Sequence, residues 1–310
     1  MSVLITGGSG FVGSMLIDKL VAKGERVISV SRHSPELKEN QVPMVGDILK
    51  PNLGLDDATL HYVSQYHGKI RAVYHLAALM KLGQDRDGSI WRTNVSGTQN
   101  VIDFCVRHEI RHLFFCSTAY TQGKNPYEWS KIRGELLVTE SPIPETTIFK
   151  PSIVMAMPEQ FYEEHFFHYV RVLIKVHRRT ELLRKLIEGT LRLPLLEPVF
   201  RLKGNPEGYL NLVSVEDVTD AMAANEKPGV YWLTNPNPST LNELSEWVGE
   251  FIKIQLRIER DFHPTPLEAA FQRLTRPFQP YLEGDSFPSH LHDCKVDKEL
   301  VQGSIKNLLY

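Results

Sequence analysis

The sequence contains 310 residues with a formal net charge of −2; 42% of the residues are hydrophobic and 23% are charged. This length allows one large domain or two smaller ones, and the composition is ordinary for a soluble globular protein. The nearly balanced charge excludes a strong overall field for nucleic acid, and we expect no nucleic-acid partner.

The first half of the chain alternates between strand-like and helical patterns. Strands are predicted at residues 3–5, 26–31, 42–45, 72–76, 112–116 and 147–149. Helices are predicted at residues 11–22, 55–66, 89–107 and 127–138. This order predicts an α/β fold, with a doubly wound parallel sheet that helices cover on both faces.

The pattern changes after Pro151. Residues 160–188 are aromatic, basic and helical in pattern, and residues 229–233 form a strand-like run before a turn cluster. Ser239 or Thr240 is placed to cap a helix that continues to about Ile252, with Glu243 in position for a capping box. We expect residues 1–155 and about 206–235 to form one domain, and residues 156–205 and 236–310 to form a smaller, mostly helical part.

A glycine-rich motif opens the chain. Residues 6–13 read Thr-Gly-Gly-Ser-Gly-Phe-Val-Gly and directly follow the apolar run 3–5. A strand that enters such a turn and leaves it as a helix is typical of dinucleotide binding, because glycines let the backbone approach a pyrophosphate. The helix N-terminus adds free N–H groups and a positive dipole end. The predicted contacts are Gly7, Gly10, Phe11, Val12 and Gly13.

The end of the second predicted strand indicates which dinucleotide is bound. NAD enzymes usually place an acid there to bind the ribose hydroxyls, but Ser31, Arg32 and His33 include none. Arg32 lies 19 residues after Gly13 and is suited to a bidentate contact with a 2′-phosphate. The sequence therefore predicts NADP(H), with a solvated surface arginine as the alternative interpretation.

Two motifs on the next elements point to proton transfer. Tyr127 and Lys131 are four residues apart on a predicted helix, so both side chains share one face. An ammonium group beside a phenol favours the phenolate and makes tyrosine a usable proton donor or acceptor. Thr118 follows the fifth predicted strand and can hydrogen-bond a substrate oxygen. A plain surface pair is the alternative interpretation of Tyr127 and Lys131.

Taken in order, these motifs resemble the extended branch of the short-chain dehydrogenase/reductase superfamily. The resemblance implies a Rossmann fold and an NADP-binding role for the first domain, with substrate binding in the second part. The matching segments are residues 6–13, Gly46-Asp47-Ile48, His75-Leu76-Ala77-Ala78, residues 94–100, Ser117-Thr118, Tyr127-x-x-x-Lys131, residues 150–154 and residues 213–218.

The resemblance also assigns further residues to the site. It implies catalytic roles for Thr118, Tyr127 and Lys131. Beyond the glycine turn and Arg32, the cofactor contacts that it implies are Asp47, Ile48, Leu76, Ala77, Ala78, Asn94, Lys131, Pro151 and Ile153. By position, Asp47 lies where the adenine edge is expected, with an ordinary Asp turn as the alternative.

Within the superfamily, three segments look like the acyl-thioester and fatty acyl-CoA reductase (male sterility-like) group. They are residues 116–120, residues 149–153 and Tyr231-Trp232-Leu233-Thr234-Asn235-Pro236. The chain departs from the usual extended pattern at one place, because only eight residues separate Thr118 from Tyr127. Longer connections there often line the substrate site, so this departure bears on the substrate class.

The leading hypothesis is an NADPH-dependent oxidoreductase that reduces an acyl thioester, bound to CoA or to a carrier protein, to an aldehyde or an alcohol. One alternative is an NADP-dependent ketone or aldehyde reductase, or a nucleotide-sugar epimerase or dehydratase. Another is a catalytically weak NADP-binding regulatory protein. The retained Tyr127 and Lys131 disfavour the last alternative, and the short connection after Thr118 keeps it open.

A basic stretch suggests a partner. Residues 165–204 carry nine Lys and Arg against three Glu, a net charge of +6 in a chain of net −2. A solvated helix face is one interpretation; docking of an acidic acyl carrier protein is the other. The aromatic residues 161–170 form either a core or the wall of an acyl-chain pocket. A homodimer is left open.

The remaining features concern compartment and metals. Three widely spaced cysteines argue against a disulfide framework and fit a reducing cytosol. We expect no transmembrane segment, since no run of about 18 uncharged apolar residues occurs, and a cytoplasmic protein, since the first strand leaves no room for a signal peptide. His290, His292, Asp293 and Cys294 cluster near the C-terminus, but no second cluster has ligand spacing, and we expect no metal.

Overall fold

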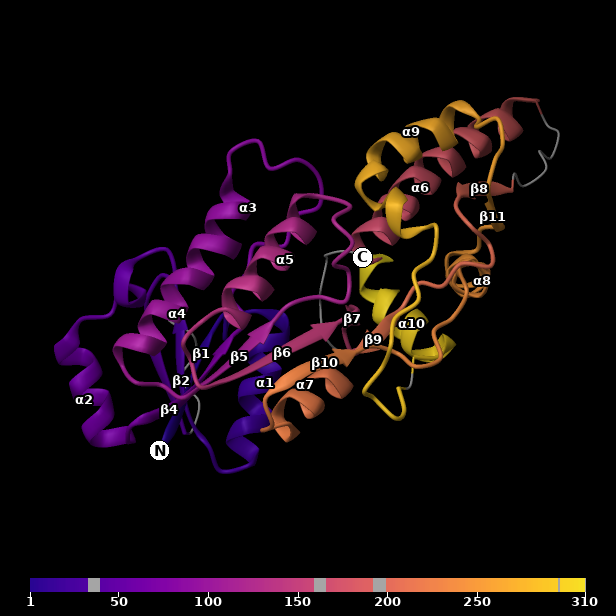
Figure 1. Ribbon diagram of the computed structural model, residues 1–310. Helices are drawn as coiled ribbons and strands as arrows, with labels where there is room; N and C mark the ends of the chain where they lie inside the picture. The colour runs from indigo at the N-terminus through magenta and orange to yellow at the C-terminus, as the bar shows by residue number, and fades with distance from the viewer. Residues whose placement is uncertain (33–39, 159–165, 192–198, 295, 310) are drawn as a thin grey trace. The chain divides into compact units, whose positions relative to one another are not determined.

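The computed structural model describes residues 1–32, 40–158, 166–191, 199–294 and 296–309 (Figure 1). The chain divides into two compact units. The first comprises Met1–Ser152, Val215–Thr234 and Pro288–His292, and the second comprises Ile153–Ser214, Asn235–Phe287 and Asp293–Tyr310. Each unit is built from segments that are far apart in the sequence.

The first unit is built on a seven-stranded parallel sheet in the order β10-β6-β5-β4-β1-β2-β3. Its strands are β1 (Ser2–Thr6), β2 (Arg26–Ser31), β3 (Gln41–Val45), β4 (Ile70–His75), β5 (His112–Cys116), β6 (Glu145–Pro151) and β10 (Gly229–Leu233). The central strands are short continuous apolar runs because both faces are covered: Val3, Leu4 and Ile5 have no exposed surface. The doubly wound parallel sheet predicted from the sequence is confirmed.

Helices cover both faces of this sheet. They are α1 (Phe11–Ala22), α2 (Asp57–His67), α3 (Ser89–Trp91), α4 (Gly97–Arg107), α5 (Pro126–Thr139) and α7 (Val215–Ala224). Figure 1 shows α4 and α5 on one side of the sheet and α1 and α7 on the other. Leu60 of α2, Phe104 of α4 and Val138 of α5 join one buried cluster with strand residues such as Leu4 and Leu113.

The strand order reverses between β1 and β4. From β1 the chain continues outward to β2 and β3, and from β4 it continues in the other direction to β5 and β6. In doubly wound sheets, ligands bind outside the carboxyl ends of the strands at such a switch point. The loops after β1 and β4 are therefore where the fold places a site.

The second unit combines helices with two small parallel sheets. Its helices are α6 (Phe166–Leu191), α8 (Leu241–Ile252), α9 (Pro266–Leu274) and α10 (Lys298–Ile305). Strand β7 (Ile153–Met155) pairs with β9 (Leu212–Ser214), and β8 (Phe200–Lys203) pairs with β11 (Leu256–Glu259). The expected capping box is present at Thr240 and Glu243, and a second one joins Thr265 and Glu268.

The two units differ in their limits from the predicted domains. The first unit ends at Ser152 and resumes at Val215, whereas the expected domain ended at 155 and resumed near 206. The reason is the pairing of β7 with β9, which draws both strands into the second unit. A segment that the sequence did not indicate, Pro288–His292, lies against β10: the Thr234 hydroxyl donates to the Pro288 carbonyl at 2.6 Å. The NADP-binding and substrate-binding roles of these parts remain predictions.

Candidate functional site

The turn after β1 leaves no room for side chains. Gly7 has φ +77, and a Cβ added there would lie 2.6 Å from the Ala77 nitrogen on the turn after β4. A Cβ at Gly13 would collide with the Gly7 carbonyl group. Glycine at both positions lets helix α1 start close beneath the ends of β1 and β4.

This cradle has the properties that a dinucleotide requires. Helix α1 begins after Gly10, and no side chain of a described residue caps its N-terminus, so its first N–H groups and dipole face the glycine turn. At the end of β6, the Ser152 hydroxyl is buried without a hydrogen bond to any described residue. A buried polar group without a partner inside the protein fits a site whose partner is a ligand.

The ends of β2 and β3 carry the predicted specificity residues. Arg32 directly follows β2 and is exposed, so its guanidinium is accessible to a phosphate; His33 lies outside the described residues. Asp47 follows β3 and accepts the Leu49 N–H at 3.0 Å, as in an Asx turn. Ile48 is buried over Gly97, and its carbonyl accepts from the Asn100 amide at 2.7 Å. The structure thus brings the turn after β3 against helix α4.

The turn after β4 contains the predicted contacts Leu76, Ala77 and Ala78, and His75 anchors it. The ring nitrogens of His75 lie 2.7 Å from the Thr6 hydroxyl and 3.0 Å from the Thr98 hydroxyl. Thr98 donates its hydrogen to the Asn94 carbonyl, so Nε2 of His75 donates to Thr98, and Nδ1 accepts from Thr6. Burial lowers the pKa of His75 to about 3, and the charge of Lys131 acts in the same direction. His75 is therefore neutral near pH 7 and joins the end of β1 to helix α4.

Asn94 lies in a π-helical turn. The helix predicted at 89–107 is present, but residues Arg92–Ser96 are wound as a π turn between α3 and α4. This turn buries Asn94 so that its amide accepts from Leu79 N–H at 2.7 Å and donates to Ser130 Oγ at 2.9 Å. Asn94 thereby joins the loop after β4 to helix α5.

The predicted catalytic residues lie just after β5 and on helix α5: Thr118 is two residues beyond the end of β5, and Tyr127 and Lys131 are on α5. Thr118 and Tyr127 are each 7% exposed and Lys131 is 4% exposed. Lys131 Nζ donates to the Cys116 carbonyl at 2.7 Å and lies 5.0 Å from the centre of the Phe115 ring. Burial lowers the pKa of Lys131, while Cys116 and Glu135 oppose that shift. Tyr127 and Lys131 are four residues apart on α5, so a buried phenol and a buried ammonium share one face of the helix.

The short connection between Thr118 and Tyr127 is held by a residue that sequence reasoning missed. The side chain of Glu128 has no exposed surface, and its carboxylate accepts the N–H groups of Gln122 at 3.2 Å and Lys124 at 2.9 Å. Asn125 caps helix α5 by accepting the Glu128 N–H at 3.0 Å. The Asn-x-x-Glu spacing, typical of a helix start, was the signal that could have found this anchor.

A second missed feature lies beside Lys131. Lys150 of β6, which is 5% exposed, donates to both carboxylate oxygens of Glu135, at 2.7 and 2.9 Å. Glu135 also accepts from the Ser117 hydroxyl. No local sequence signal marks this pair, since its members lie on different elements.

The last two predicted cofactor contacts fall in different units. Pro151 ends β6 in the first unit, where its carbonyl accepts the Ala119 N–H at 2.8 Å. Ile153 begins β7 in the second unit. The structure therefore groups Pro151, but not Ile153, with the other predicted residues of the first unit.

Two cations of the basic segment 165–204 are paired with acids from another part of the chain. Arg201 makes a two-pronged contact with the buried Glu268, at 3.0 and 2.9 Å, and Lys203 lies 3.6 Å from Asp261. These two acids lie after residue 204 in the sequence, so the net charge of +6 counted over residues 165–204 did not include them. Arg192 and Phe161 lie outside the described residues, as do the side chains of Arg179, Arg184 and Lys185.

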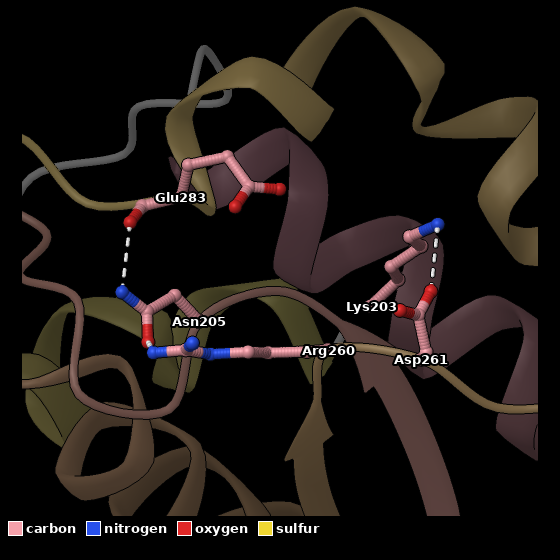
Figure 2. A pocket seen from close by; sticks show the side chains of 5 residues that line it. All are labelled: Lys203, Asn205, Arg260, Asp261 and Glu283. Atoms are coloured by element: carbon pink, nitrogen blue, oxygen red, sulfur yellow. Dashed lines mark hydrogen bonds and ion pairs between the residues drawn. The ribbon is translucent and has the colours of Figure 1, made fainter.

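An open hollow of about 370 Å³ lies in the second unit (Figure 2). Its lining residues are Lys203, Asn205, Arg260, Asp261 and Glu283. Figure 2 shows Arg260 directed at the Asn205 side chain, whose oxygen it contacts at 2.9 Å, and Lys203 directed at Asp261. Two cations and two carboxylates balance one another there, so the hollow has no preference for an anion.

The C-terminal cluster is arranged as a structural contact. The ring of His290 accepts the Trp232 N–H at 3.0 Å and packs edge-on against Tyr231. Among the described residues, no three His, Cys, Asp or Glu side chains gather as they would around a metal ion. Within those same ranges, no helix has the length and apolar character to cross a bilayer.

Comparison with known proteins gives the following matches. Residues 3–150 match the model of the NAD dependent epimerase/dehydratase family. A 2-alkyl-3-oxoalkanoate reductase of Stenotrophomonas maltophilia (strain K279a) is 40% identical over 119 residues, which are 38% of this chain and 33% of that protein. A fatty acyl-CoA reductase-like protein of Drosophila melanogaster is 25% identical over 150 residues, 40% of this chain and 27% of that protein. The chain thus spans about a third of the length of these curated relatives.

The likeness to solved structures extends over the whole chain. The Bordetella bronchiseptica enzyme WbmG, in complex with NAD and UDP, aligns with a TM-score of 0.62 and 17% identity over 98% of this chain and 94% of that chain. At this identity the likeness concerns the fold.

Proposed function

We propose that this chain is an NADPH-dependent reductase of an acyl thioester. The premise is that it belongs to the epimerase/dehydratase family of the extended short-chain dehydrogenase/reductase superfamily. The observation that carries the proposal is that Thr118, Tyr127 and Lys131 are all nearly buried and belong to the same unit as the glycine cradle. A proton donor, its cation and a hydroxyl at the strand ends are the protein groups that carbonyl reduction needs.

The role of each residue follows from its chemistry. When bound, the nicotinamide supplies a hydride to the carbonyl carbon. Thr118 and Tyr127 donate hydrogen bonds to the carbonyl oxygen, where negative charge develops. Tyr127 then gives its proton to that oxygen, and the Lys131 ammonium stabilises the phenolate that remains. Collapse of the resulting hemithioacetal breaks the carbon–sulfur bond and releases thiol and aldehyde.

The proposed cofactor is NADPH. Its support is the exposed Arg32 directly after β2, together with the lack of an acid at Ser31 and Arg32. The pyrophosphate is assigned to the turn from Gly7 to Gly13 and the N-terminus of α1. The solved neighbour in complex with NAD has the same fold, and the choice between the two cofactors is therefore part of the test.

Two observations support an acyl substrate, and one of them also favours a second candidate. The Drosophila relative is named for fatty acyl-CoA reduction, whereas the Stenotrophomonas relative is named for reduction of a 2-alkyl-3-oxoalkanoate. The second candidate is accordingly reduction of a ketone next to an alkyl chain. The same residues perform both reactions, because the hydride, the oxyanion and the proton are equivalent in the two cases.

The test is NADPH oxidation with a panel of acyl-CoAs, acyl carrier proteins, 3-oxoacids, aldehydes and UDP-sugars, each with Y127F as the control. Thioester reduction predicts NADPH loss, thiol release in equal amount and an aldehyde product. NADPH loss with 3-oxoacids but no thiol release from thioesters would replace the first candidate by the second. Conversion of a UDP-sugar without net NADPH loss would place the chain among the epimerases instead.

A further inference from the structure

A second lysine is buried close to the proposed catalytic lysine. Lys150 Nζ contacts both oxygens of Glu135, at 2.7 and 2.9 Å, and the Thr121 hydroxyl at 3.0 Å. The same ammonium lies 4.7 Å from the centre of the Trp232 ring. A buried ammonium is costly unless it is matched, and here a carboxylate, a hydroxyl and an aromatic face match it.

Glu135 extends the catalytic face of helix α5. Tyr127, Lys131 and Glu135 follow one another at intervals of four residues, so their side chains lie on one face. A lysine and a glutamate at this spacing normally pair with each other. In the described structure, however, Lys131 donates to the Cys116 carbonyl, and Glu135 is occupied by Lys150 and Ser117.

We propose that Lys150 is a positioning residue for the Tyr127–Lys131 pair. Because Lys150 binds the Glu135 carboxylate, the Lys131 ammonium does not pair with Glu135 and points to the end of β5. The positive charge of Lys150 also offsets the negative charge of Glu135. The same network fixes Ser117, which precedes Thr118, and Thr121, which lies in the short connection to Tyr127. The inference rests on the proposed function in so far as Tyr127 is taken as the proton donor.

The electrostatic part of this role depends on which neighbours of Lys131 are charged. Cys116 of β5 contacts it, and burial raises the pKa of that thiol, so the thiol is neutral near pH 7. His75 of β4 is neutral as well, since burial lowers its pKa to about 3. Glu135 is thus the charged group that acts on Lys131, and Lys150 is the cation that offsets it.

The signs of the expected effects follow from Coulomb's law. Removing the charge of Lys150 leaves Glu135 unbalanced; its negative potential disfavours the Tyr127 phenolate and raises the phenol pKa. Removing the charge of Glu135 leaves Lys150 unbalanced and lowers that pKa. Tyr127 and Glu135 are two helical turns apart, so each shift is on the order of half to one pH unit.

The experiment compares K150M, E135Q, the double variant E135Q/K150M and K150R. The Tyr127 phenol is titrated by tyrosinate absorbance, with Y127F in each background subtracted, and no substrate is needed. We expect K150M to shift the titration to higher pH and E135Q to lower pH, with the double variant and K150R close to wild type. The basic limb of the pH profile for NADPH oxidation moves by the same amounts in the same directions.

Several outcomes overturn the proposal. Shifts of the same sign in both single variants, no shift in either, or a K150R variant that behaves like K150M would show that Lys150 only packs. If K150M does not fold, comparison of E135Q with the double variant still isolates the charge of Lys150. Because the phenol titrates without substrate, an enzyme that fails on thioesters but shows the opposed shifts refutes the proposed substrate and retains this inference.

Discussion

Tyr127 lies in the first turn of helix α5. The residue is 7% exposed, so a substrate oxygen that reaches its phenol does so in a largely dehydrated setting. Hydrogen bonds and charges act more strongly there than in water. Lys131, one turn further on, adds a fixed positive charge to the same face.

The first prediction concerns this phenol. Y127F is expected to lower turnover by about 10²–10⁴-fold, because a general acid contributes that much, while NADPH binding stays nearly unchanged. Turnover and NADPH fluorescence titration measure the two effects. K131A serves as the comparison and is expected to weaken both, since the resemblance implies that Lys131 contacts the cofactor as well as acting on the phenol. Retention of more than about a tenth of the wild-type rate by Y127F would place the proton donor elsewhere.

Arg32 carries the cofactor prediction. R32D is expected to weaken NADPH by about 1.5–3 kcal/mol, the range for a hydrogen bond to a charged group, and to leave NADH affinity much less changed. Fluorescence titration of both cofactors measures this. The exposed Arg26, at the start of β2, provides a matched control in R26D. Equal or tighter binding of NADH by the wild type would contradict the assignment.

The low pKa of buried His75 predicts that the stability of the protein depends on pH. The unfolded chain protonates this histidine near pH 6.5, whereas the folded chain does so only near pH 3. The unfolding free energy is therefore fully maintained above 6.5 and falls as the pH decreases toward 3. From pH 6.5 to 4.5 this one residue costs about 2.5 kcal/mol. Urea unfolding of wild type and H75Q checks it: H75Q, although less stable at pH 7, is expected to lose less over that interval.

At the scale of single residues, the sequence predicts contacts that a local pattern encodes. The glycine cradle and the Tyr127–Lys131 face follow from spacing along one turn or one helix. The ion pairs of Lys150 with Glu135 and of Arg201 with Glu268 could not be predicted, because their members meet only through folding. Counting charge along 165–204 overlooked Glu268 and Asp261 for the same reason.

At the scale of elements, the start of α5 determines how the short connection is held. The Glu128 carboxylate accepts hydrogen bonds from the N–H groups of Gln122 and Lys124, and Asn125 caps the helix. A connection of eight residues thus has its own internal anchor. The position of Tyr127, the residue before Glu128, depends directly on that anchor.

The prediction at this scale uses two helix starts. E128A is expected to destabilise the protein by about 1–3 kcal/mol, because two backbone donors lose their buried acceptor, and to lower kcat through displacement of Tyr127. T240A removes the cap of α8 in the other unit and is expected to cost about 1 kcal/mol without a change in kcat. Thermal unfolding and turnover measure both. Equal effects of the two variants on kcat would show that the connection does not position Tyr127.

Element boundaries show what periodicity can and cannot indicate. The strand at 229–233 was predicted at the residues where it occurs, and of the two predicted cap residues, Ser239 and Thr240, the cap is Thr240. The π turn in Arg92–Ser96 was not, since its helical pattern continues unbroken through Asn94. The strands β7, β8, β9 and β11 were also missed, because short runs are ambiguous by periodicity and these four lie outside the alternating strand–helix order of the first half.

At the scale of the whole molecule, the proposed substrate implies an anionic carrier. Arg201 and Lys203 are paired with acids of the same unit. The docking hypothesis concerns the basic segment 165–204 as a whole. We expect kcat/KM for carrier-bound acyl groups to fall with ionic strength, and that for a free aldehyde to change little, since salt screens steering between proteins.

Charge reversal tests this expectation. The quadruple variant R178E/R179E/R184E/K185E is expected to raise KM for carrier-bound substrate and to leave NADPH affinity unchanged. K203Q, which removes a cation already paired with Asp261, is the matched control and should behave like the wild type. Wild-type kinetics of the quadruple variant on carrier-bound and free substrates would show that these cations form only a solvated face.

The parallel pairing of β10 with β6 has a consequence for how the chain is made. Thr147–Pro151 bonds to Gly229–Leu233, so the edge of β6 is completed only by residues that emerge from the ribosome about 80 residues later. At 5–20 residues per second the nascent chain carries an open strand edge for roughly 4–16 s. A fragment that ends near residue 152 would keep that edge permanently and offer Ile148 and Phe149 to other chains. Because β10 is synthesised late, we expect the nascent chain to bind chaperones during synthesis and fragments that end near residue 152 to aggregate.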